Sequence, residues 1–251
     1  MVKHLHTLSN ATPTPVGVPQ GAVLCPTLSN IIINDLTFHP LNNINYSKYA
    51  DDLALWTSDK QTSKWITNLQ LALNHLVNWT QAWGLSIAPS KTKAIFFSRR
   101  KTPNTTLKIG NIPIEYSKSH KFLGLTMDRN LTWKPHIQDL KKKCTSDVKL
   151  LRTLSKIHWG AEFKVLRTLY TALILPKLNY GSFLYDTAAK SNLAILDSIQ
   201  NHALRTMLGS LRCTRIEHMQ VLANIPPLYI NRKIQLFDYS ARTMAISSNP
   251  I

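Results

Sequence analysis

Tyr49-Ala50-Asp51-Asp52 decides this chain, because it places two adjacent carboxylates between two apolar-rich segments. The pattern predicts a strand that ends at these residues and a second strand, Leu53-Ala54-Leu55-Trp56, that leaves them. Adjacent side chains in a regular strand point to opposite faces, so neighbouring aspartates there could not share a site. At the tight turn of a hairpin, both can lean toward one cation. Hard ions such as Mg²⁺ prefer oxygen ligands, and paired-metal sites for phosphoryl or nucleotidyl transfer use such carboxylates.

A loop rich in glycine and proline precedes the two aspartates. It begins as Gly17-Val18-Pro19-Gln20-Gly21 and leads into Thr27 to Leu36, an apolar segment of helical length. Glycine lets the backbone approach a bound strand or nucleotide closely, and the Gln20 amide both donates and accepts hydrogen bonds. The alternative for the aspartates is an ordinary turn, which Asp favours by bonding its own backbone. The upstream loop favours the metal-site interpretation.

Together, these features resemble the reverse transcriptases of non-LTR, LINE-like retrotransposons of the jockey type. The glycine-rich loop is similar to motif B and the Tyr-Ala-Asp-Asp turn is similar to motif C, with about thirty residues between them. The resemblance covers nearly the whole chain in the family's order. Trp83 to Lys93 is similar to motif D, Lys121 to Leu125 to motif E (the primer grip), and Trp133 to Ile137 and Leu196 to Arg205 to thumb and post-thumb segments.

The resemblance implies an RNA-directed DNA polymerase, in which a primer 3′-hydroxyl attacks the α-phosphate of a deoxynucleotide. Asp51 is then the main metal ligand of the turn and Asp52 a weaker helper, with Mg²⁺ as cofactor and Mn²⁺ as the second candidate. The implied partners are an RNA template, a DNA primer or RNA–DNA hybrid, and deoxynucleoside triphosphates. The implied contacts to nucleotide or template are Pro19, Gln20, Gly21, Tyr49 and Lys91, and those to the primer are Phe122, Leu123 and Gly124.

The chain departs from the family at motif A. Family members carry a further catalytic aspartate on a strand before motif B, whereas the first acidic residue here is Asp35. Two metal ions about 3.5–4 Å apart need more oxygen ligands than one turn supplies. We therefore expect a C-terminal polymerase segment without motif A and the fingers, inactive as this chain. The alternative is a non-catalytic, basic remnant that binds nucleic acid.

Composition agrees with a nucleic-acid partner. The formal charge is +17, from 30 basic and 13 acidic residues, which favours a polyanion. There is no run of about 18 apolar residues and no apolar signal-peptide core, so we expect an intracellular protein, nuclear or cytoplasmic, without a membrane role. The three cysteines, Cys25, Cys144 and Cys213, are far apart and indicate neither zinc nor disulfides.

The hydrophobic periodicity predicts an α+β fold in two parts. Residues 1–128 are expected to form a partial polymerase palm, an antiparallel sheet backed by helices. Apolar residues at helical spacing predict a helix from Gln61 to Trp83 that stops at Gly84. Lys93 to Ser98 is predicted to be a strand, and Gly110-Asn111 a two-residue hairpin turn leading toward a strand around Phe122.

Residues 129–251 are expected to form a helical thumb and post-thumb region. The pattern becomes helical from about residue 134, with a first apolar stripe that runs from Ile137 to Leu154. A second stripe begins at Phe163 and is expected to stop near Pro176, and a third closes at Gly209. The lysines and arginines beside these stripes are expected to contact nucleic-acid backbone, although a solvated helix face is the ordinary alternative.

Overall fold

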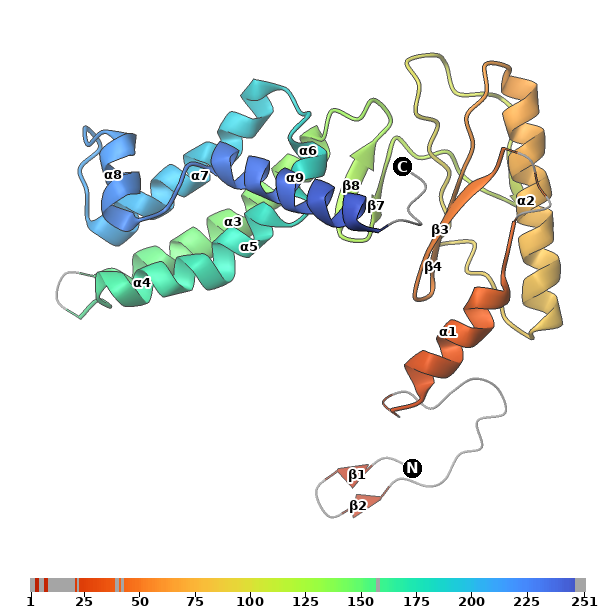
Figure 1. Cartoon of the computed structure of the whole chain (residues 1–251), viewed down its shortest axis with the longest axis horizontal. Coiled ribbons are helices and arrows are strands. Elements are labelled where there is room, and N and C mark those ends of the chain that lie inside the picture. The colour runs from red at the N-terminus through yellow and green to blue at the C-terminus, as the bar shows by residue number, and fades with distance from the viewer. Residues whose placement is uncertain are drawn as a thin grey trace. The chain divides into compact units, whose positions relative to one another are not determined.

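The chain forms an α+β structure of helices and short antiparallel hairpins, as expected (Figure 1). The computed structural model describes residues 3–4, 7–8, 21, 23–38, 41, 43–156 and 159–246. It divides into two compact units, residues 1–94 with 101–116 and residues 95–100 with 117–251. The hairpin of the expected primer grip therefore groups with the helices that follow it. Among the described helices, none is both long and apolar enough to cross a bilayer.

Among its described residues, the first unit contains three antiparallel β-hairpins and two helices. Helix α2 ends where expected: Gly84 takes the left-handed φ of 65°, and the Leu85 amide donates to the Thr80 carbonyl at 2.8 Å. The described elements are β1 (Lys3–His4), β2 (Thr7–Leu8), α1 (Cys25–Asp35), β3 (Asn45–Tyr49), β4 (Asp52–Trp56), α2 (Thr62–Ala82), β5 (Lys108–Ile109) and β6 (Ile112–Pro113).

Two small apolar clusters hold this unit together. Side chains alternate along β3 and β4, so Tyr46 on one strand and Leu55 on the other share the face that packs toward α2. One cluster has Leu36, Phe38, Ala72 and Leu76 at its centre, and the other has Leu73, Leu107, Ile109 and Ile114.

One expected strand of the first unit is wrong. Between Lys93 and Ser98, the described backbone pairs only at Ala94, which forms an isolated bridge with Tyr116. Residues 95–100 then belong to the second unit, where the Ser98 carbonyl accepts a hydrogen bond of 2.6 Å from Arg129. An alternating sequence forms a strand only where a neighbouring strand lies alongside it, and the tertiary structure places none along residues 93–98 beyond Tyr116 among the described residues. The turn at Gly110-Asn111 is confirmed, with β5 and β6 on either side.

The described part of the second unit contains residues 95–100 and one hairpin, followed by helices. Helices α3 and α7 pack against each other across one apolar cluster, and the stripes expected on them are buried there (Figure 1). Gly209 ends α7 in the left-handed conformation, as expected. The elements are β7 (Ser119–Phe122), β8 (Leu125–Asp128), α3 (Lys134–Leu154), α4 (Phe163–Leu169), the π-helix η1 (Tyr170–Ile174), α5 (Leu175–Asn179), α6 (Ser182–Tyr185), α7 (Lys190–Leu208), α8 (Ile216–Ala223) and α9 (Leu228–Ala245).

The expected stop near Pro176 is wrong. The helix continues through Pro176 to Asn179, and a π-helical turn from Tyr170 to Ile174 precedes the proline. Proline cannot donate a backbone hydrogen bond and crowds the preceding turn, and a wider turn relieves both problems. Tyr170 and Ile174 are fully buried, so core packing holds this distorted turn in place.

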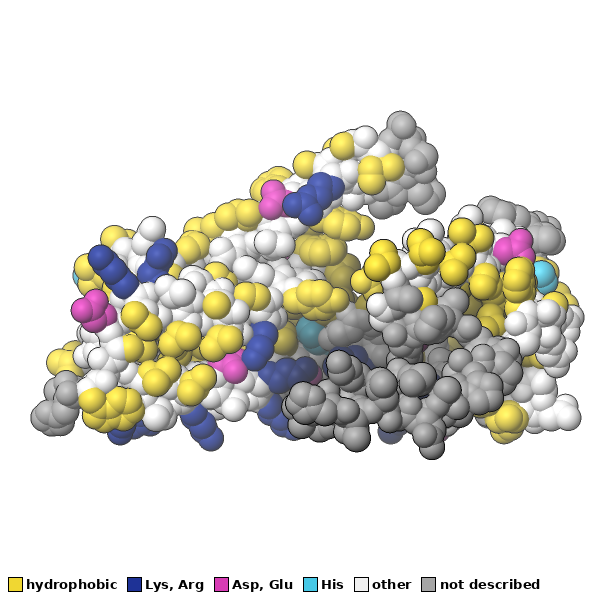
Figure 2. Space-filling view, turned by 90° about the horizontal axis from the view of Figure 1, so that it is seen from below, with side chains coloured by type: hydrophobic (Ala, Val, Ile, Leu, Met, Phe, Trp, Pro, Cys, Tyr) yellow, Lys and Arg dark blue, Asp and Glu magenta, His cyan; other side chains and the backbone are white. Residues whose placement is uncertain are grey.

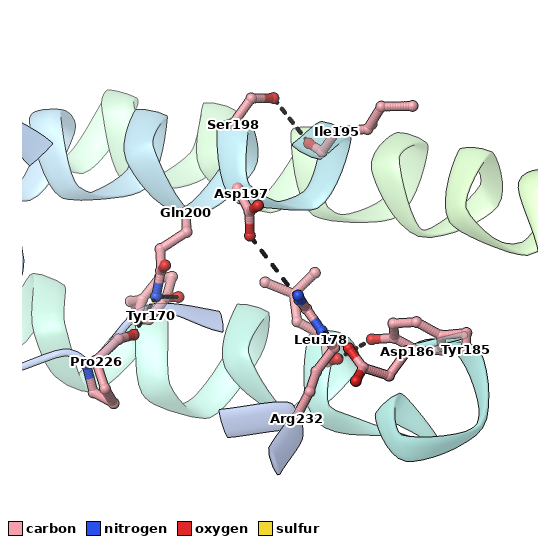
Figure 3. A network of polar contacts seen from close by, with 10 residues as sticks. All are labelled: Tyr170, Leu178, Tyr185, Asp186, Ile195, Asp197, Ser198, Gln200, Pro226 and Arg232. Atoms are coloured by element: carbon pink, nitrogen blue, oxygen red, sulfur yellow. Dashed lines mark hydrogen bonds and ion pairs between the residues drawn. The ribbon is translucent and has the colours of Figure 1, made fainter. Parts of the chain in front are cut away.

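A buried polar network joins α9 to the other helices (Figure 3). Arg232, which is 6% exposed, donates to Asp186 at 2.6 Å and lies 4.0 Å from Asp197. Beside it, the Gln200 amide donates to the Tyr170 hydroxyl and to the Pro226 carbonyl. These bonds satisfy groups whose burial would otherwise be costly, and they fix how the helices pack.

Candidate active site

The two aspartates lie at the tip of a hairpin, as expected. Tyr49 and Asp52 form the last pair of the β3–β4 ladder, and Ala50 and Asp51 make the turn between them. Ala50 takes the left-handed φ of 50°, which is unfavourable for a residue with a Cβ atom. A strained turn therefore presents adjacent carboxylates, the geometry that could not arise within a regular strand.

Both carboxylates are exposed and available. Among the described residues, no hydrogen bond or ion pair engages the side chain of Asp51 or Asp52. Their oxygens are the donor type that a hard divalent cation prefers. The turn thus fits part of a Mg²⁺ site. The described residues hold no group of three or more acidic, histidine or cysteine side chains arranged for a metal, so this pair supplies only part of a ligand set.

The helix that follows the glycine-rich loop reaches the hairpin at its C-terminal end. The Lys48 ammonium, on β3, donates to the carbonyls of Ile33 and Leu36, each at 3.0 Å, and reaches that of Asn34 at 3.5 Å. These contacts connect α1 to the strand that carries Asp51. Lys48 is not among the site residues predicted from the sequence, although it is the one basic residue in the strand before the aspartates.

The segment similar to motif D packs on the same unit. Ile87 joins the clusters that contain Leu53 and Leu55 of β4, so this loop is anchored to the hairpin's apolar face. Lys91 follows in a turn whose amide donates to the Ala88 carbonyl at 3.1 Å, and its side chain is exposed. An exposed lysine on an anchored loop is suited to bind phosphate.

The expected nucleotide contacts upstream are only partly described. Gly21 is exposed and has a φ of 92°, a conformation that glycine adopts without strain. Pro19 and Gln20 lie outside the described residues, so their contact with nucleotide or template remains a prediction.

The expected primer-grip residues form the β7–β8 turn of the second unit. Leu123 and Gly124 take φ values of 44° and 83°, and Phe122 pairs with Leu125. The Tyr180 hydroxyl, from the chain after α5, donates to the Leu123 carbonyl at 2.7 Å. A Cβ atom on Gly124 would lie 3.0 Å from the Tyr180 ring, so this position needs glycine for two reasons. Tyr180 could not be predicted from the sequence, because its partner lies 57 residues away along the chain.

Helix α3 carries unpaired positive charge along one side. Five of its exposed basic residues, from Lys134 to Arg152, follow one another at spacings of seven, one, seven and three residues. On an α-helix they fall within an arc of about 100° and extend for about 27 Å. Among the described residues none of these side chains forms an ion pair, whereas Lys143, on another side, binds Asp139 at 2.7 Å. We call this set the α3 basic side: Lys134, Lys141, Lys142, Lys149 and Arg152.

Basic side chains also outnumber acidic ones on the face seen in Figure 2. This excess agrees with the formal charge of +17 for the whole chain. A row of unpaired cations on one helix side matches the charge of a nucleic-acid backbone better than isolated, paired lysines do.

Comparison with known proteins places these features in a family context. Residues 4–127 match the sequence model of the family described as reverse transcriptase (RNA-dependent DNA polymerase). The chain is 28% identical over 230 residues to the RNA-directed DNA polymerase from mobile element jockey of Drosophila melanogaster, covering 88% of this chain and 25% of that protein. It is 30% identical over 199 residues to the probable RNA-directed DNA polymerase from transposon BS of the same organism, covering 76% and 22%.

Similarity extends to insect R1 elements. The putative 115 kDa protein of the type-1 retrotransposable element R1DM of Drosophila melanogaster is 27% identical over 92% of this chain and 23% of its own length. The chain spans about a quarter of the length of these relatives. No solved structure matches it.

Proposed function

Residues 4–127 are a reverse transcriptase domain homologous to those of non-LTR retrotransposons, and on that premise we propose that this chain carries the polymerase segment from motif B to the thumb. The observation that carries the proposal is the hairpin tip at Asp51, where two exposed carboxylates, in no ion pair with any described residue, lie on a strained turn. In this proposal residues 1–128 act as partial palm and residues 129–251 as thumb and post-thumb, working on RNA and deoxynucleotides inside the cell.

Each side chain has a role that follows from its chemistry. Asp51 is the main metal ligand, and Asp52, at the strand's first position, assists it. Mg²⁺, or Mn²⁺ in its place, supplies charge stabilisation to the attacking and leaving oxygens of nucleotidyl transfer. Lys91 binds the phosphates of the incoming nucleotide as a point charge. The remaining proposed contacts are Pro19, Gln20, Gly21 and Tyr49 to nucleotide or template, and Phe122, Leu123 and Gly124 to the primer.

The proposed metal ligands can be tested without catalysis. Fe²⁺ bound in place of Mg²⁺ reduces added hydrogen peroxide to hydroxide and a hydroxyl radical, becoming Fe³⁺, and the radical cuts the backbone beside the metal. We expect cleavage near residues 49–53, and loss of it in Asp51→Asn. The matched control is Asp59→Asn, because Asp59 is an aspartate of the same unit whose carboxylate accepts the Gln61 amide at 2.8 Å. Cleavage that survives Asp51→Asn would refute the assignment.

We propose further that the 251-residue chain does not extend a primer. Positioning and charge stabilisation supply nearly all of the catalysis in phosphoryl transfer, and two neighbouring carboxylates on one turn cannot surround two cations. Primer extension with Mg²⁺ or Mn²⁺ is the measurement. Extension that disappears in Asp51→Ala would contradict the proposal and show that another residue completes the site.

A second candidate function, binding of nucleic acid without chemistry, is favoured by the α3 basic side. Each phosphate that it neutralises should add about 0.9 to the slope of log affinity against log salt on B-DNA. Filter binding at several salt concentrations tests this slope. Lys142→Gln should lower it by about that amount, whereas Lys143→Gln, the control whose lysine already pairs with Asp139, should change it less. Affinity that does not change with salt would exclude backbone contact.

A further inference from the structure

Helix α1 has no cation of its own at its C-terminal end. The last carbonyls of a helix lack partners within the helix and carry partial negative charge, so a nearby cation stabilises them. The last turn of α1 contains no basic residue. Lys48, which lies 15 residues after Ile33 in the chain, supplies that cation to three carbonyls, those of Ile33, Asn34 and Leu36.

The strand directs Lys48 away from the carboxylates. Alternation places its side chain on the face of Tyr46, whose ring centroid lies 5.6 Å from the ammonium, while Tyr49 and Asp52 form a pair with the opposite orientation. An ammonium has three donors, and the carbonyls of Ile33, Asn34 and Leu36, at and just after the end of α1, offer three acceptors. Lys48 is therefore committed to α1 and is not a free phosphate ligand.

The connection spans the two features on which the proposed function depends. Lys48 immediately precedes Tyr49, so it lies at the hairpin end that carries Asp51. The helix that it holds begins at Cys25, directly after the glycine-rich loop. Only Cys25 of this helix is buried, so apolar packing contributes little to its placement.

We propose that Lys48 is a positioning residue that holds the C-terminal end of α1 against the Asp51 hairpin. Hydrogen bonds from a charged donor are about twice as strong as neutral ones, and Lys48 is half-buried, where water competes less. By holding a rigid helix at one end, Lys48 sets the distance from the loop before α1 to the carboxylates. This role rests on the proposed function, in which that loop and those carboxylates meet one nucleotide.

Spin labels can measure this placement directly. Asn30→Cys on α1 and Ser47→Cys on β3 introduce exposed attachment sites in a Cys213→Ser background, because Cys213 is the exposed native cysteine. We expect one narrow distance distribution in the parent chain, a broad one in Lys48→Met, and a narrow one again in Lys48→Arg, which restores the charge and donors. An unchanged distribution in Lys48→Met would overturn the proposal.

Lys93→Met is the matched control. Lys93 lies in the same unit and pairs with Glu115 at 2.5 Å, but that ion pair is at the surface, where such pairs contribute little. Its loss should leave the distance distribution narrow. Equal broadening in Lys93→Met would show that the unit loosens nonspecifically, and would also overturn the role given to Lys48.

Amide exchange gives a second readout if Lys48→Met folds poorly. The Leu36 amide donates to the Ile33 carbonyl at 3.2 Å, beside the Lys48 contact. In Lys48→Gln we expect its exchange to quicken by about tenfold, the cost of a hydrogen bond to a charged group, with exchange in α3 and α7 unchanged. Exchange at the parent rate would count against the proposal. Neither measurement uses metal or nucleotide. Failure of the Fe²⁺ cleavage test would therefore refute the proposed metal ligands without changing the result expected for Lys48.

Discussion

The two units differ in how much apolar core supports their functional residues. The second unit contains one cluster of 21 buried hydrophobic side chains among the described residues, whereas the first has two separate clusters of four. Hydrophobic burial is the main favourable term in folding, so the second unit should be the more stable. The hairpin with Asp51 therefore belongs to the unit with the smaller apolar clusters, and the Leu123–Gly124 turn belongs to the unit with the larger one.

Because its apolar clusters are small, the first unit should depend more on single polar contacts to hold its elements in position. Loss of one hydrogen-bonded link matters little where many buried side chains hold an element in place. It matters more at α1, of which only Cys25 is buried. We therefore expect loss of Lys48 to move α1 more than loss of one hydrogen bond would move a helix packed in the large apolar cluster of the second unit.

The largest expected effect tests the core of the second unit. Leu196→Ala removes a side chain that is 1% exposed in the large cluster, and should cost that unit roughly 3–5 kcal/mol of stability. Leu222→Ala, on a side chain that is 69% exposed, is the control and should change stability by less than about 0.5 kcal/mol. Hydrogen exchange resolved by peptide measures each unit. Equal loss of protection in the first unit would mean that the two units unfold together.

The next largest effect on stability is expected at Asp128, the last residue of β8, which lies shortly before α3. Its carboxylate accepts from the amides of Asn130, Thr132 and Trp133, the last at 2.8 Å, and from the Thr132 hydroxyl. Burial raises the pKa of Asp128, but these hydrogen bonds outweigh it and the net shift is downward. Asp128→Asn should cost roughly 2–3 kcal/mol, measured by urea unfolding, whereas Asp238→Asn at an exposed site should be neutral.

The glycines of two hairpins separate backbone strain from side-chain contact. Gly110 and Gly124 both have left-handed φ, but a Cβ atom would meet nothing within 4 Å at Gly110 and would lie 3.0 Å from Tyr180 at Gly124. Each Ala substitution should cost about 1 kcal/mol for the backbone. Gly124→Ala should cost more, and Tyr180→Ala should remove the excess in a double-mutant cycle. Equal losses of stability in Gly110→Ala and Gly124→Ala would show that the Tyr180 ring moves away from the added methyl group at no cost.

The smallest expected effect is a pH dependence of the second unit. Burial lowers the pKa of His136, Lys143 and Lys121 lower it further, and Asp139 opposes them. The folded state therefore binds this proton more weakly than the unfolded state does, so the contribution is complete above about pH 6.5 and is lost as the pH falls through the lowered pKa. Thermal unfolding from pH 8 to 5 measures it. The dependence of the unfolding temperature on pH should be weaker in His136→Gln. An unchanged dependence would show that other groups cause it.

The residues alone were sufficient where local chemistry decides structure. The helix that ends at Gly84, the turn at Gly110-Asn111 and the hairpin at Asp51 were all predicted, since periodicity and turn propensity act over a few neighbours. The family assignment rested on short ordered motifs and is confirmed. The strand after Lys93 and the stop at Pro176 were wrong, because a distant strand edge and a buried π-turn decided them.

What the sequence determined by itself is therefore the chemistry available: two carboxylates at a turn, a net positive charge and the order of the motifs. Only the tertiary structure decided which groups meet. It joined Lys48 to the carbonyls of α1 and Tyr180 to the Leu123 turn, across 15 and 57 residues of chain. The physical reason is that a hydrogen bond or a van der Waals contact depends on distance in space, and the sequence specifies that distance only through the packing of the whole unit.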